Sequence, residues 1–306
     1  MTLVQLLYAV KIADTKSMNK AAAELFISQP ALSGAVRDLE EELHIELFIR
    51  TNRGIVVTTE GEEFLSYARQ MVELHKMIDE RYIEQKQSKK KFSVSMQHYS
   101  FAVEAFIELG RQFSMGEFEL AVHETKTYEV IENVRDCRSE IGVLYLNDFN
   151  EKAMKKIFAE NGLEFSPLFV CGVSVYLSKT HPLAEKEKIE FGELEDYPCL
   201  SFEQGEKNSF YFAEEVLSTL HYKQIIKADD RATMLNLMVG MQGYTLCSGI
   251  ICGELNGGNF VSVPLDTDDT MTIGYVKRKN MPLSSLGQKY IEILKRYGKG
   301  GTGVGD

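Results

Sequence analysis

The chain is poor in residues that build covalent or rigid scaffolds. Its 306 residues include five cysteines, six prolines and no tryptophan. The cysteine count is odd and no CxxC spacing occurs, so we expect reduced thiols rather than disulfides or a zinc site. Neither a cofactor nor a bound metal is expected.

Long apolar runs and a cationic leader are also missing. There is no uninterrupted run of about 18 apolar residues, the length needed to cross a membrane. Met1 leads directly into Thr2 and Leu3 without a positively charged segment, which argues against a signal peptide. We therefore expect a cytoplasmic protein with no membrane partner.

Positive charge is scarce as well. The chain carries 34 Lys and Arg against 45 Asp and Glu, a formal net charge of −11. Composition alone therefore disfavours a nucleic-acid partner. The 44% apolar and 26% charged residues exclude collagen-like and disordered chains and are typical of a globular protein.

The first 45 residues contain successive segments with the apolar spacing of helices. Thr2, Ser17 and Ser28 each precede such a segment, where a hydroxyl can accept a hydrogen bond from a free helical N–H. Only residues 26–28 separate the second and third segments, which predicts a helix-turn-helix. Residues 47–50, apolar except for Arg50, and apolar residues 55–57 flank a polar, glycine-ended loop, which predicts a two-stranded wing.

Residues 59–87 have no proline, and no glycine after Gly61, and predict one long helix. Apolar residues and one histidine recur along it in steps of four and three, at Phe64, Ala68, Met71, His75, Ile78 and Tyr82. This heptad seam favours pairing with a second copy of the chain. The lysine-rich residues that follow predict a solvated hinge.

Strand-like and helix-like segments alternate in the remainder, which predicts an α/β domain. The predicted strands are 92–96, 118–123, 141–145, 169–177, 198–202, 224–227, 260–263 and 271–276. The glycine-rich residues 299–306 are interpreted as a flexible tail.

Several motifs of the head resemble the signature of LysR-type transcriptional regulators. In order, they are Lys16-Ser17-Met18-Asn19-Lys20-Ala21-Ala22, Leu25, Ser28-Gln29-Pro30-Ala31-Leu32-Ser33, Leu39-Glu40-Glu41-Glu42-Leu43, Leu47-Phe48 and Thr58-Thr59-Glu60-Gly61-Glu62. The resemblance implies a mainly α winged helix-turn-helix domain at 1–58 and a linker and dimerisation helix at 59–88. It further implies an effector-binding domain at 92–298. That domain would comprise two α/β subdomains like those of periplasmic binding proteins, about 92–165 with 265–298 and about 166–264, joined by two crossover strands.

In this architecture the third helix enters the major groove with its amino-terminal residues toward the bases. Gln can pair with adenine and Arg with guanine, while basic residues near the helix starts and the wing suit phosphates. The candidate DNA contacts are Ser17, Asn19, Lys20, Ser28, Gln29, Pro30, Ala31, Ser33, Arg37, Arg50, Asn52 and Arg53. Gly34 lies in the third helix, at a position where many relatives carry a larger residue. A glycine inside a helix costs about 1 kcal/mol of helix stability relative to alanine.

Small ligands of such domains bind at the carboxyl ends of parallel strands, between the subdomains. Residues 97–100 lead into a helix whose first N–H groups could receive an anion, which favours an anionic effector. The family pattern places Ser100 where relatives use a hydroxyl on the ligand. The candidate effector contacts are His98, Tyr99, Ser100, Thr125, Asn147, Ser201, Phe202, Gln204 and Tyr244, with Leu146 as a weaker one.

The function expected is therefore a DNA-binding transcriptional regulator switched by a small molecule. Its candidate partners are operator DNA, the effector, further copies of the chain in a dimer or tetramer, and RNA polymerase. Two alternatives stay open: a thiol-switch regulator of the same family, using Cys247 or Cys252, and a binding protein that does not contact DNA. An enzyme is disfavoured because no Ser-His-Asp order, HExxH motif or Walker loop appears and the six histidines are dispersed.

Overall fold

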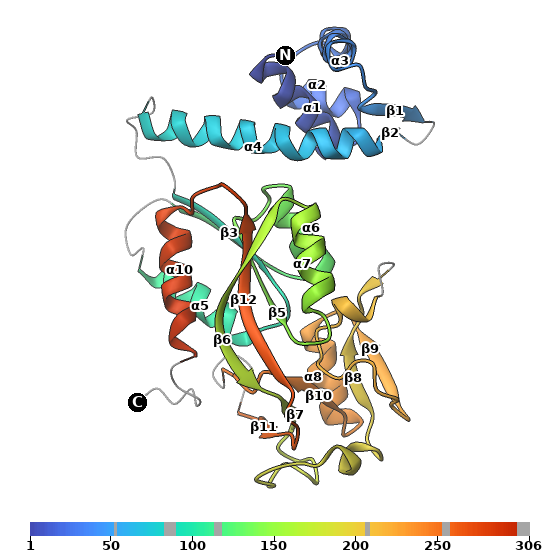
Figure 1. The fold of residues 1–306 in the computed structure, drawn as a ribbon, viewed down its shortest axis with the longest axis vertical. Helices are drawn as coiled ribbons and strands as arrows, with labels where there is room; N and C mark the ends of the chain where they lie inside the picture. Colours follow the sequence, from blue (N-terminus) through green and yellow to red (C-terminus); the bar gives the residue numbers. More distant parts are fainter. Residues whose placement is uncertain (52–53, 83–89, 113–117, 206–208, 253–257, 299–306) are drawn as a thin grey trace. The chain divides into compact units, whose positions relative to one another are not determined.

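The computed structural model describes residues 1–51, 54–82, 90–112, 118–205, 209–252 and 258–298 (Figure 1). The chain divides into two compact units, Met1–Ser88 and Lys89–Asp306. The first unit contains the predicted DNA-binding head and linker helix, and the second contains the predicted effector domain. Within the described residues, no helix is both long and apolar enough to span a membrane.

The first unit is a winged helix-turn-helix followed by a long helix. Its elements are α1 (Leu3–Thr15), α2 (Met18–Glu24), α3 (Gln29–Leu43), β1 (Phe48–Thr51), β2 (Gly54–Val57) and α4 (Thr59–Tyr82). The predicted caps are confirmed, since the hydroxyls of Thr2, Ser17 and Ser28 each accept a backbone N–H of the following helix. The predicted wing is confirmed as an antiparallel β1–β2 pair.

The helices of the head bury their apolar faces against one another. Ile12 of α1 packs with Leu32 and Val36 of α3 in one cluster. A second cluster joins α1 and α3 to the first half of α4, which contributes the buried Leu65. Ala68 of α4 is only 1% exposed. The amino-terminal half of α4 therefore belongs to the head.

Further along α4, a stripe of large apolar side chains is exposed in the single chain. Its members are Tyr67, Met71, Leu74 and Ile78, with 47–60% of each side chain accessible. The spacing is again four, three and four. The predicted seam shares Met71 and Ile78 with this stripe but differs at Ala68 and His75. Ala68 is buried at the head, whereas His75 is exposed but polar, so Tyr67 and Leu74 of the neighbouring face complete the apolar stripe.

The second unit is an α/β domain with two five-stranded sheets. The elements of its first part are β3 (Lys90–Met96), α5 (Ser100–Arg111), β4 (Phe118–Glu124), α6 (Thr127–Arg135), β5 (Ile141–Leu146), α7 (Glu151–Glu160) and β6 (Leu163–Gly172). Then follow β7 (Ser174–Ser178), η1 (Phe191–Leu194), β8 (Cys199–Phe202), η3 (Phe210–Phe212), β9 (Ile225–Ala228), α8 (Arg231–Gly240), β10 (Tyr244–Cys247), β11 (Phe260–Pro264), β12 (Thr270–Arg278) and α10 (Ser285–Arg296).

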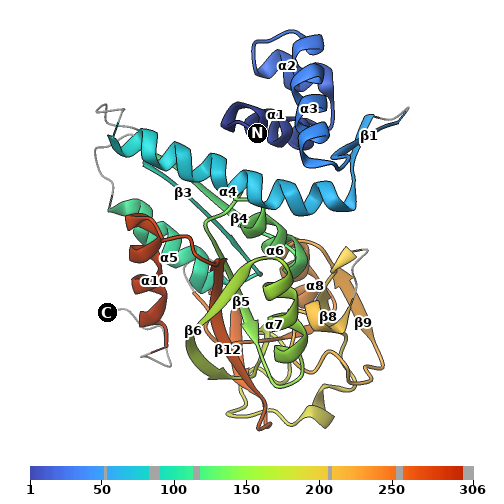
Figure 2. The ribbon, with the colours of Figure 1, turned by 45° about the horizontal axis from the view of Figure 1, so that its top comes forward.

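The first sheet has the strand order β4-β3-β5-β12-β6 and forms what we call subdomain I, with α5, α6, α7 and α10. Helices α5 and α10 cover one face, while α6 and α7 cover the other (Figures 1 and 2). Alternate residues of β5 follow this division: Val143 and Tyr145 pack with α5 and α10, whereas Leu144 and Leu146 pack with α6 and α7. All six residues of β5 are buried, as expected for a strand covered on both faces.

The second sheet has the order β11-β7-β10-β8-β9 and forms subdomain II, with α8. Two long strands join the subdomains: β6 continues through Val173 into β7, and β12 follows β11. They pair with each other in antiparallel register from Leu163 with Arg278 to Gly172 with Thr270. The two predicted crossover strands are therefore present, and the single predicted strand 169–177 is divided between β6 and β7.

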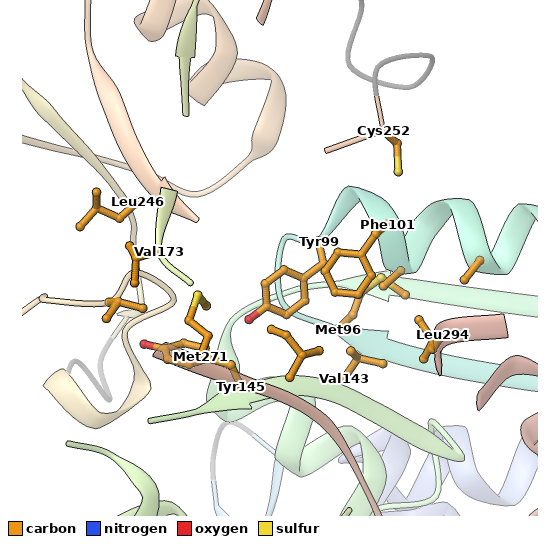
Figure 3. Close-up of a cluster of buried hydrophobic side chains, with 14 of the residues drawn as sticks. Met96, Tyr99, Phe101, Val143, Tyr145, Val173, Leu246, Cys252, Met271 and Leu294 are labelled. Atoms are coloured by element: carbon orange, nitrogen blue, oxygen red, sulfur yellow. The ribbon is translucent and has the colours of Figure 1, made fainter. Parts of the chain in front are cut away.

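One apolar cluster runs from subdomain I into subdomain II (Figure 3). Tyr99 and Phe101 lie side by side in it, with ring centroids 5.1 Å apart, and the hydroxyl end of Tyr99 points toward Met271. Val173 and Leu246 continue the cluster on the subdomain II side. The polar groups of the interface between the subdomains lie next to this core.

Candidate functional site

The amino-terminal turn of α3 presents the side chains that the sequence predicts to face DNA. Ser28, Pro30 and Ala31 are exposed, and Gln29 and Ser33 are half-buried. The Ser28 hydroxyl accepts the Ala31 N–H at 3.3 Å and holds the start of the helix. A ridge of small side chains next to one amide fits the major groove, where an α-helix can approach base edges.

The wing is tied to this ridge through one side-chain bond. The Arg50 guanidinium in β1 donates to the Ser33 hydroxyl in α3, with 2.6 Å between Nη2 and Oγ. Asn52 and Arg53, also predicted to contact DNA, lie outside the described residues. The structure thus brings together Ser33 and Arg50, which are 17 positions apart in the chain.

The remaining predicted DNA residues lie at the start of α2 and in the third turn of α3. Asn19 and Lys20 are exposed at the start of α2, while the Ser17 hydroxyl accepts the Lys20 N–H at 3.4 Å as a cap. Arg37 lies one turn beyond Ser33 and is 3.8 Å from Glu41. The side chains of Lys20 and Arg37 are both exposed.

A carboxylate that the sequence did not single out positions the wing. Glu40 of α3 accepts the Leu47 N–H at 2.7 Å and the Phe48 N–H at 3.2 Å through one oxygen. Gly54 starts the second wing strand with φ of +127°, and a Cβ there would lie 2.9 Å from the Lys16 carbonyl oxygen. These contacts fix the wing against the helices.

In the second unit, a polar network occupies the interface between the subdomains. Its centre is His98 in the loop after β3, whose backbone N–H donates to Glu214 Oε2 at 2.9 Å. The same oxygen lies 2.8 Å from His98 Nδ1. The imidazole also stacks on Phe202, with centroids 3.7 Å apart and planes inclined by 3°. His98 belongs to subdomain I, whereas Glu214 and Phe202 belong to subdomain II.

A chain of amide and hydroxyl bonds extends from Glu214 into subdomain I. The Gln204 amide donates to Glu214 Oε1 at 3.0 Å, and its carbonyl oxygen accepts the Thr127 N–H at 3.1 Å. The Gln97 amide donates to the Thr127 hydroxyl at 2.6 Å. Tyr99 donates from its hydroxyl to the Gln97 carbonyl oxygen at 2.8 Å. Each buried polar group is thus satisfied by another part of the chain.

The neighbouring carboxylate, Glu215, turns the other way. Its oxygens accept the Ser201 hydroxyl at 3.0 Å and the Phe202 N–H at 2.9 Å, both within subdomain II. The Tyr145 hydroxyl of subdomain I is 3.1 Å from the Ala213 carbonyl oxygen and 3.3 Å from that of Glu215. Residues 213–215 are therefore held by both subdomains.

Burial and mutual charge change the acidity of this cluster. Burial, together with the Glu214 charge, raises the pKa of Glu215 to about 7. Burial opposes the charged form of His98, but the charge and hydrogen bond of Glu214 outweigh it and raise the pKa of His98 above 6.5. The pKa of Glu215 therefore lies near neutral pH, and the protonated form of His98 is favoured by its contact with Glu214.

The other predicted effector residues lie at or beyond the edges of the network. The Ser100 hydroxyl accepts the Cys252 N–H at 3.3 Å, another bond between the subdomains. Thr125 bonds to Glu129, and Asn147 exchanges bonds with Asn150, so both act in local turns. Leu146 packs in the core with α6 and α7. The structure thus groups His98, Tyr99, Ser201, Phe202 and Gln204 and leaves Thr125 and Asn147 outside.

Tyr244 is 2% exposed and faces the core of subdomain II. It lines a separate cavity of about 90 Å³ together with Phe191, Tyr197 and Tyr222. The Lys223–Glu195 ion pair borders the same cavity. No residue of the His98–Glu214 network lines it, so Tyr244 is not part of that network.

Sequence reasoning missed the acids of the interface. Glu214 and Glu215 are 6% and 5% exposed, although they stand in the run Phe212-Ala213-Glu214-Glu215-Val216. Two adjacent acids between apolar residues were the feature of the sequence that could have indicated buried carboxylates. Glu124 and Arg231 were missed as well; they form an ion pair between β4 and α8. Among the described residues, no cluster of three His, Cys, Asp or Glu side chains could hold a metal ion.

Two family models match the chain and together span most of it. The model of the bacterial regulatory helix-turn-helix protein of the lysR family matches residues 3–62, and that of the LysR substrate binding domain matches residues 100–299. The chain belongs to the LysR family. It is a DNA-binding transcriptional regulator with an effector-binding domain, as the head motifs predict, and the expected fold is confirmed.

Other LysR-family members are similar along nearly the whole chain. An HTH-type transcriptional regulator of Escherichia coli, YbhD, is 25% identical over 93% of this chain and 88% of its own. OxyR of the same species, a DNA-binding transcriptional dual regulator, is 23% identical over 96% and 95%. A full-length OxyR variant of Pseudomonas aeruginosa shares the fold, with a TM-score of 0.65, 19% identity and coverage of 97% and 94%.

None of the five cysteines of this LysR-family chain is in a disulfide. Burial raises the pKa of Cys171 to about 11 and of Cys199, Cys247 and Cys252 each to about 12. Cys137 Sγ is 2.9 Å from the Arg278 guanidinium. Because the thiolate is the reactive form, the raised pKa values disfavour attack on peroxide by those four thiols.

Proposed function

We propose that this regulator reads operator DNA with the start of α3 and the wing, and that a small molecule bound between subdomains I and II controls its activity. The Arg50–Ser33 bond supports the first part, because it presents wing and recognition helix as one surface. The second part is carried by the His98–Glu214 contact. There the Glu214 carboxylate accepts the His98 N–H, in the loop directly before the helix whose first N–H groups are expected to receive an anion.

DNA binding is tested by footprinting the full chain on the intergenic DNA beside its own gene at low salt. Gln29→Ala removes the amide best placed to pair with adenine, so we expect footprint loss without unfolding. Gln288→Ala is the matched control, because this exposed glutamine lies in α10 of the second unit. A footprint equally strong in the Gln29 variant would remove the assignment of α3 as the reading helix.

The effector site is tested by a thermal-shift screen of small metabolites, led by carboxylates. A ligand that binds the folded chain raises its unfolding temperature in proportion to the logarithm of its concentration. Ser100→Ala should abolish that shift, and Ser93→Ala, which alters a β3 serine bonded to the Arg138 carbonyl, should preserve it. A shift that survives Ser100→Ala would place the ligand elsewhere.

The regulator would act as a homodimer or tetramer in the cytoplasm, with RNA polymerase as a further partner. The exposed stripe of α4 supports self-association, since large apolar side chains at heptad spacing pair with like stripes. Few cations line the DNA face, so each head would make few phosphate contacts. Several heads acting together would then supply the affinity.

A thiol switch is the second candidate, favoured by the similarity to OxyR. Cys247 and Cys252 are the closest pair in sequence, and both are core thiols with raised pKa values. A reporter assay with Cys247→Ser and Cys252→Ser decides between the two candidates. We expect an unchanged response to peroxide; loss of a response that the parent chain shows would establish the thiol switch.

A further inference from the structure

The network between the subdomains has a charge pattern that an effector site alone does not require. Glu214 and Glu215 are adjacent, buried carboxylates, and each is bonded by groups that fix its direction. His98 is in direct contact with Glu214, while the Glu215 carboxylate is held by Ser201 and Phe202. Two adjacent buried acids next to one protonated imidazole carry a surplus of one negative charge unless one of the acids retains a proton.

We propose that His98, Glu214 and Glu215 form a proton-dependent latch that holds subdomain I against subdomain II, so that pH is an input to this regulator. The latch is closed when His98 is protonated and the two acids retain one proton between them. The proposal rests on the proposed function, since it takes closure of the subdomains as the state that the effector controls. The latch adds to that function a second ligand of the same interface, the proton.

The groups packed around the latch do not supply the missing positive charge. Glu124 and Arg231 pair with each other, so their charges compensate. Asp230 caps α8 by accepting the Thr233 N–H and is a further acid near His98. The remaining titratable neighbours are the hydroxyls of Tyr99, Tyr145 and Tyr222 and the thiols of Cys171 and Cys199, which are neutral near pH 7.

Deprotonation would weaken the contact between the subdomains. If His98 loses its proton, the bond from Nδ1 to Glu214 loses its charge. If both acids are ionised, their negative charges lie next to each other without solvent. Opening exposes the carboxylates to water, where repulsion and the cost of burial both fall. The open form is therefore favoured when the protons leave.

The sign of the pH dependence follows from the two pKa shifts. Burial and the Glu214 charge raise the pKa of Glu215 from 4.5 to about 7, so the closed form binds more protons than the open form between these values. Burial lowers the pKa of His98, but Glu214 outweighs it and the net pKa is raised above 6.5. Both groups therefore favour closure in acid. Each contributes up to about tenfold in the closed-to-open ratio per pH unit within its window.

One substitution provides a direct probe of the latch. The chain has no tryptophan, so Phe202→Trp introduces a single indole in the ring position that stacks on His98. A protonated imidazole quenches an indole stacked on it, and exposure to water shifts the indole emission to longer wavelength. For the full-length variant we expect weak, short-wavelength emission near pH 6 and brighter, longer-wavelength emission near pH 8.

Three further changes in the Phe202→Trp background assign the signal. Glu214→Gln removes the charge that holds His98, so the emission should be long-wavelength at both pH values. His98→Asn should abolish the pH-dependent quenching, which keeps the test valid if the Glu214 variant fails to fold. His123→Asn is the matched control, because this exposed histidine lies on β4 of the same unit, and its profile should equal that of the parent.

Emission that does not change between about pH 6 and pH 8, or a change that persists in His98→Asn, would overturn the latch. Operator footprinting at one fixed pH separates this failure from failure of the proposed function. If the protein binds DNA but its emission does not change with pH, the latch is rejected and the proposed function stands. A titrating emission without any DNA binding removes the proposed function and leaves the latch as a property of the second unit.

Discussion

The Arg50 guanidinium and the Ser33 hydroxyl are joined by a hydrogen bond of 2.6 Å. Arg50 belongs to β1 of the wing, and Ser33 belongs to the second turn of the helix that we expect in the major groove. Both residues are candidate DNA contacts in their own right. Because of this bond, a change in the position of the wing also affects the recognition helix, and a change in the helix affects the wing.

Arg50→Ala and Ser33→Ala should each weaken operator binding, and their effects should not add. Each single variant loses the shared bond and its own DNA contact, while the double variant loses the bond only once. We expect about 1–3 kcal/mol for each single variant, which is the range of one good side-chain contact to a base. Fluorescence anisotropy with labelled operator duplex measures all three variants, with Arg138→Ala of the second unit as control. Strict additivity would show that the bond does not couple the two sites on DNA.

Lys20→Ala should act on affinity through salt. Lys20 is exposed at the start of α2, where phosphates are contacted in helix-turn-helix proteins. Losing one phosphate contact lowers the slope of log affinity against log salt by about 1. The operator and a random duplex should be affected alike. Lys179 is an exposed lysine of the second unit, and Lys179→Ala should leave the salt slope unchanged. An unchanged slope for Lys20→Ala would exclude a phosphate contact by Lys20.

Gly34→Ala should stabilise the head. No heavy atom lies within 4 Å of the Cβ that this change would add, so the helix gains without a clash. The gain should be about 1 kcal/mol in the free energy of unfolding, measured by urea denaturation. Gly287→Ala in α10 makes the same substitution where the Cβ would collide with the Glu140 carboxylate, and it should destabilise. Equal effects at the two positions would mean that space around the helix does not decide the outcome.

Tyr145→Phe should loosen the interface between the subdomains. The variant removes a hydroxyl bonded to the Ala213 and Glu215 carbonyl oxygens, at a cost of about 0.5–1.5 kcal/mol in the free energy of unfolding. It should also shift closure toward the open form. Tyr290→Phe removes one bond to the Ala102 carbonyl within subdomain I and should cost stability without shifting closure. Single-tryptophan emission and urea denaturation together distinguish the two variants.

The features that the sequence predicted correctly are local ones. Ser17 and Ser28 stand directly before the helices they cap, and the wing loop is contained within a few residues. Such signals need no knowledge of the rest of the chain. The His98–Glu214 contact joins residues 116 positions apart, and no spacing rule places two such residues together. The sequence predicts an effector site at loop 97–100, but it gives no sign of Glu214, which the packing of subdomain II brings against His98.

For the linker helix as well, the sequence predicts the element but not which of its faces is exposed. Periodicity predicts both the helix and a heptad stripe on it, but two adjacent faces of one helix can each carry apolar residues at that spacing. The head selects between them, because Ala68 and Leu65 pack into its core. Only after that choice do Tyr67 and Leu74 become part of the exposed stripe.

Met71→Glu should convert the assembly to monomers. Met71 lies within the exposed stripe of Tyr67, Leu74 and Ile78, and a charge there would be buried without a partner when two stripes pair. Sedimentation velocity should show a lower mass, and operator affinity should fall because the two heads are no longer linked. Lys76→Gln changes the net charge by the same amount at an exposed polar position of α4, and its mass should be unchanged. An intact dimer in the Met71 variant would move the dimer contact away from this stripe.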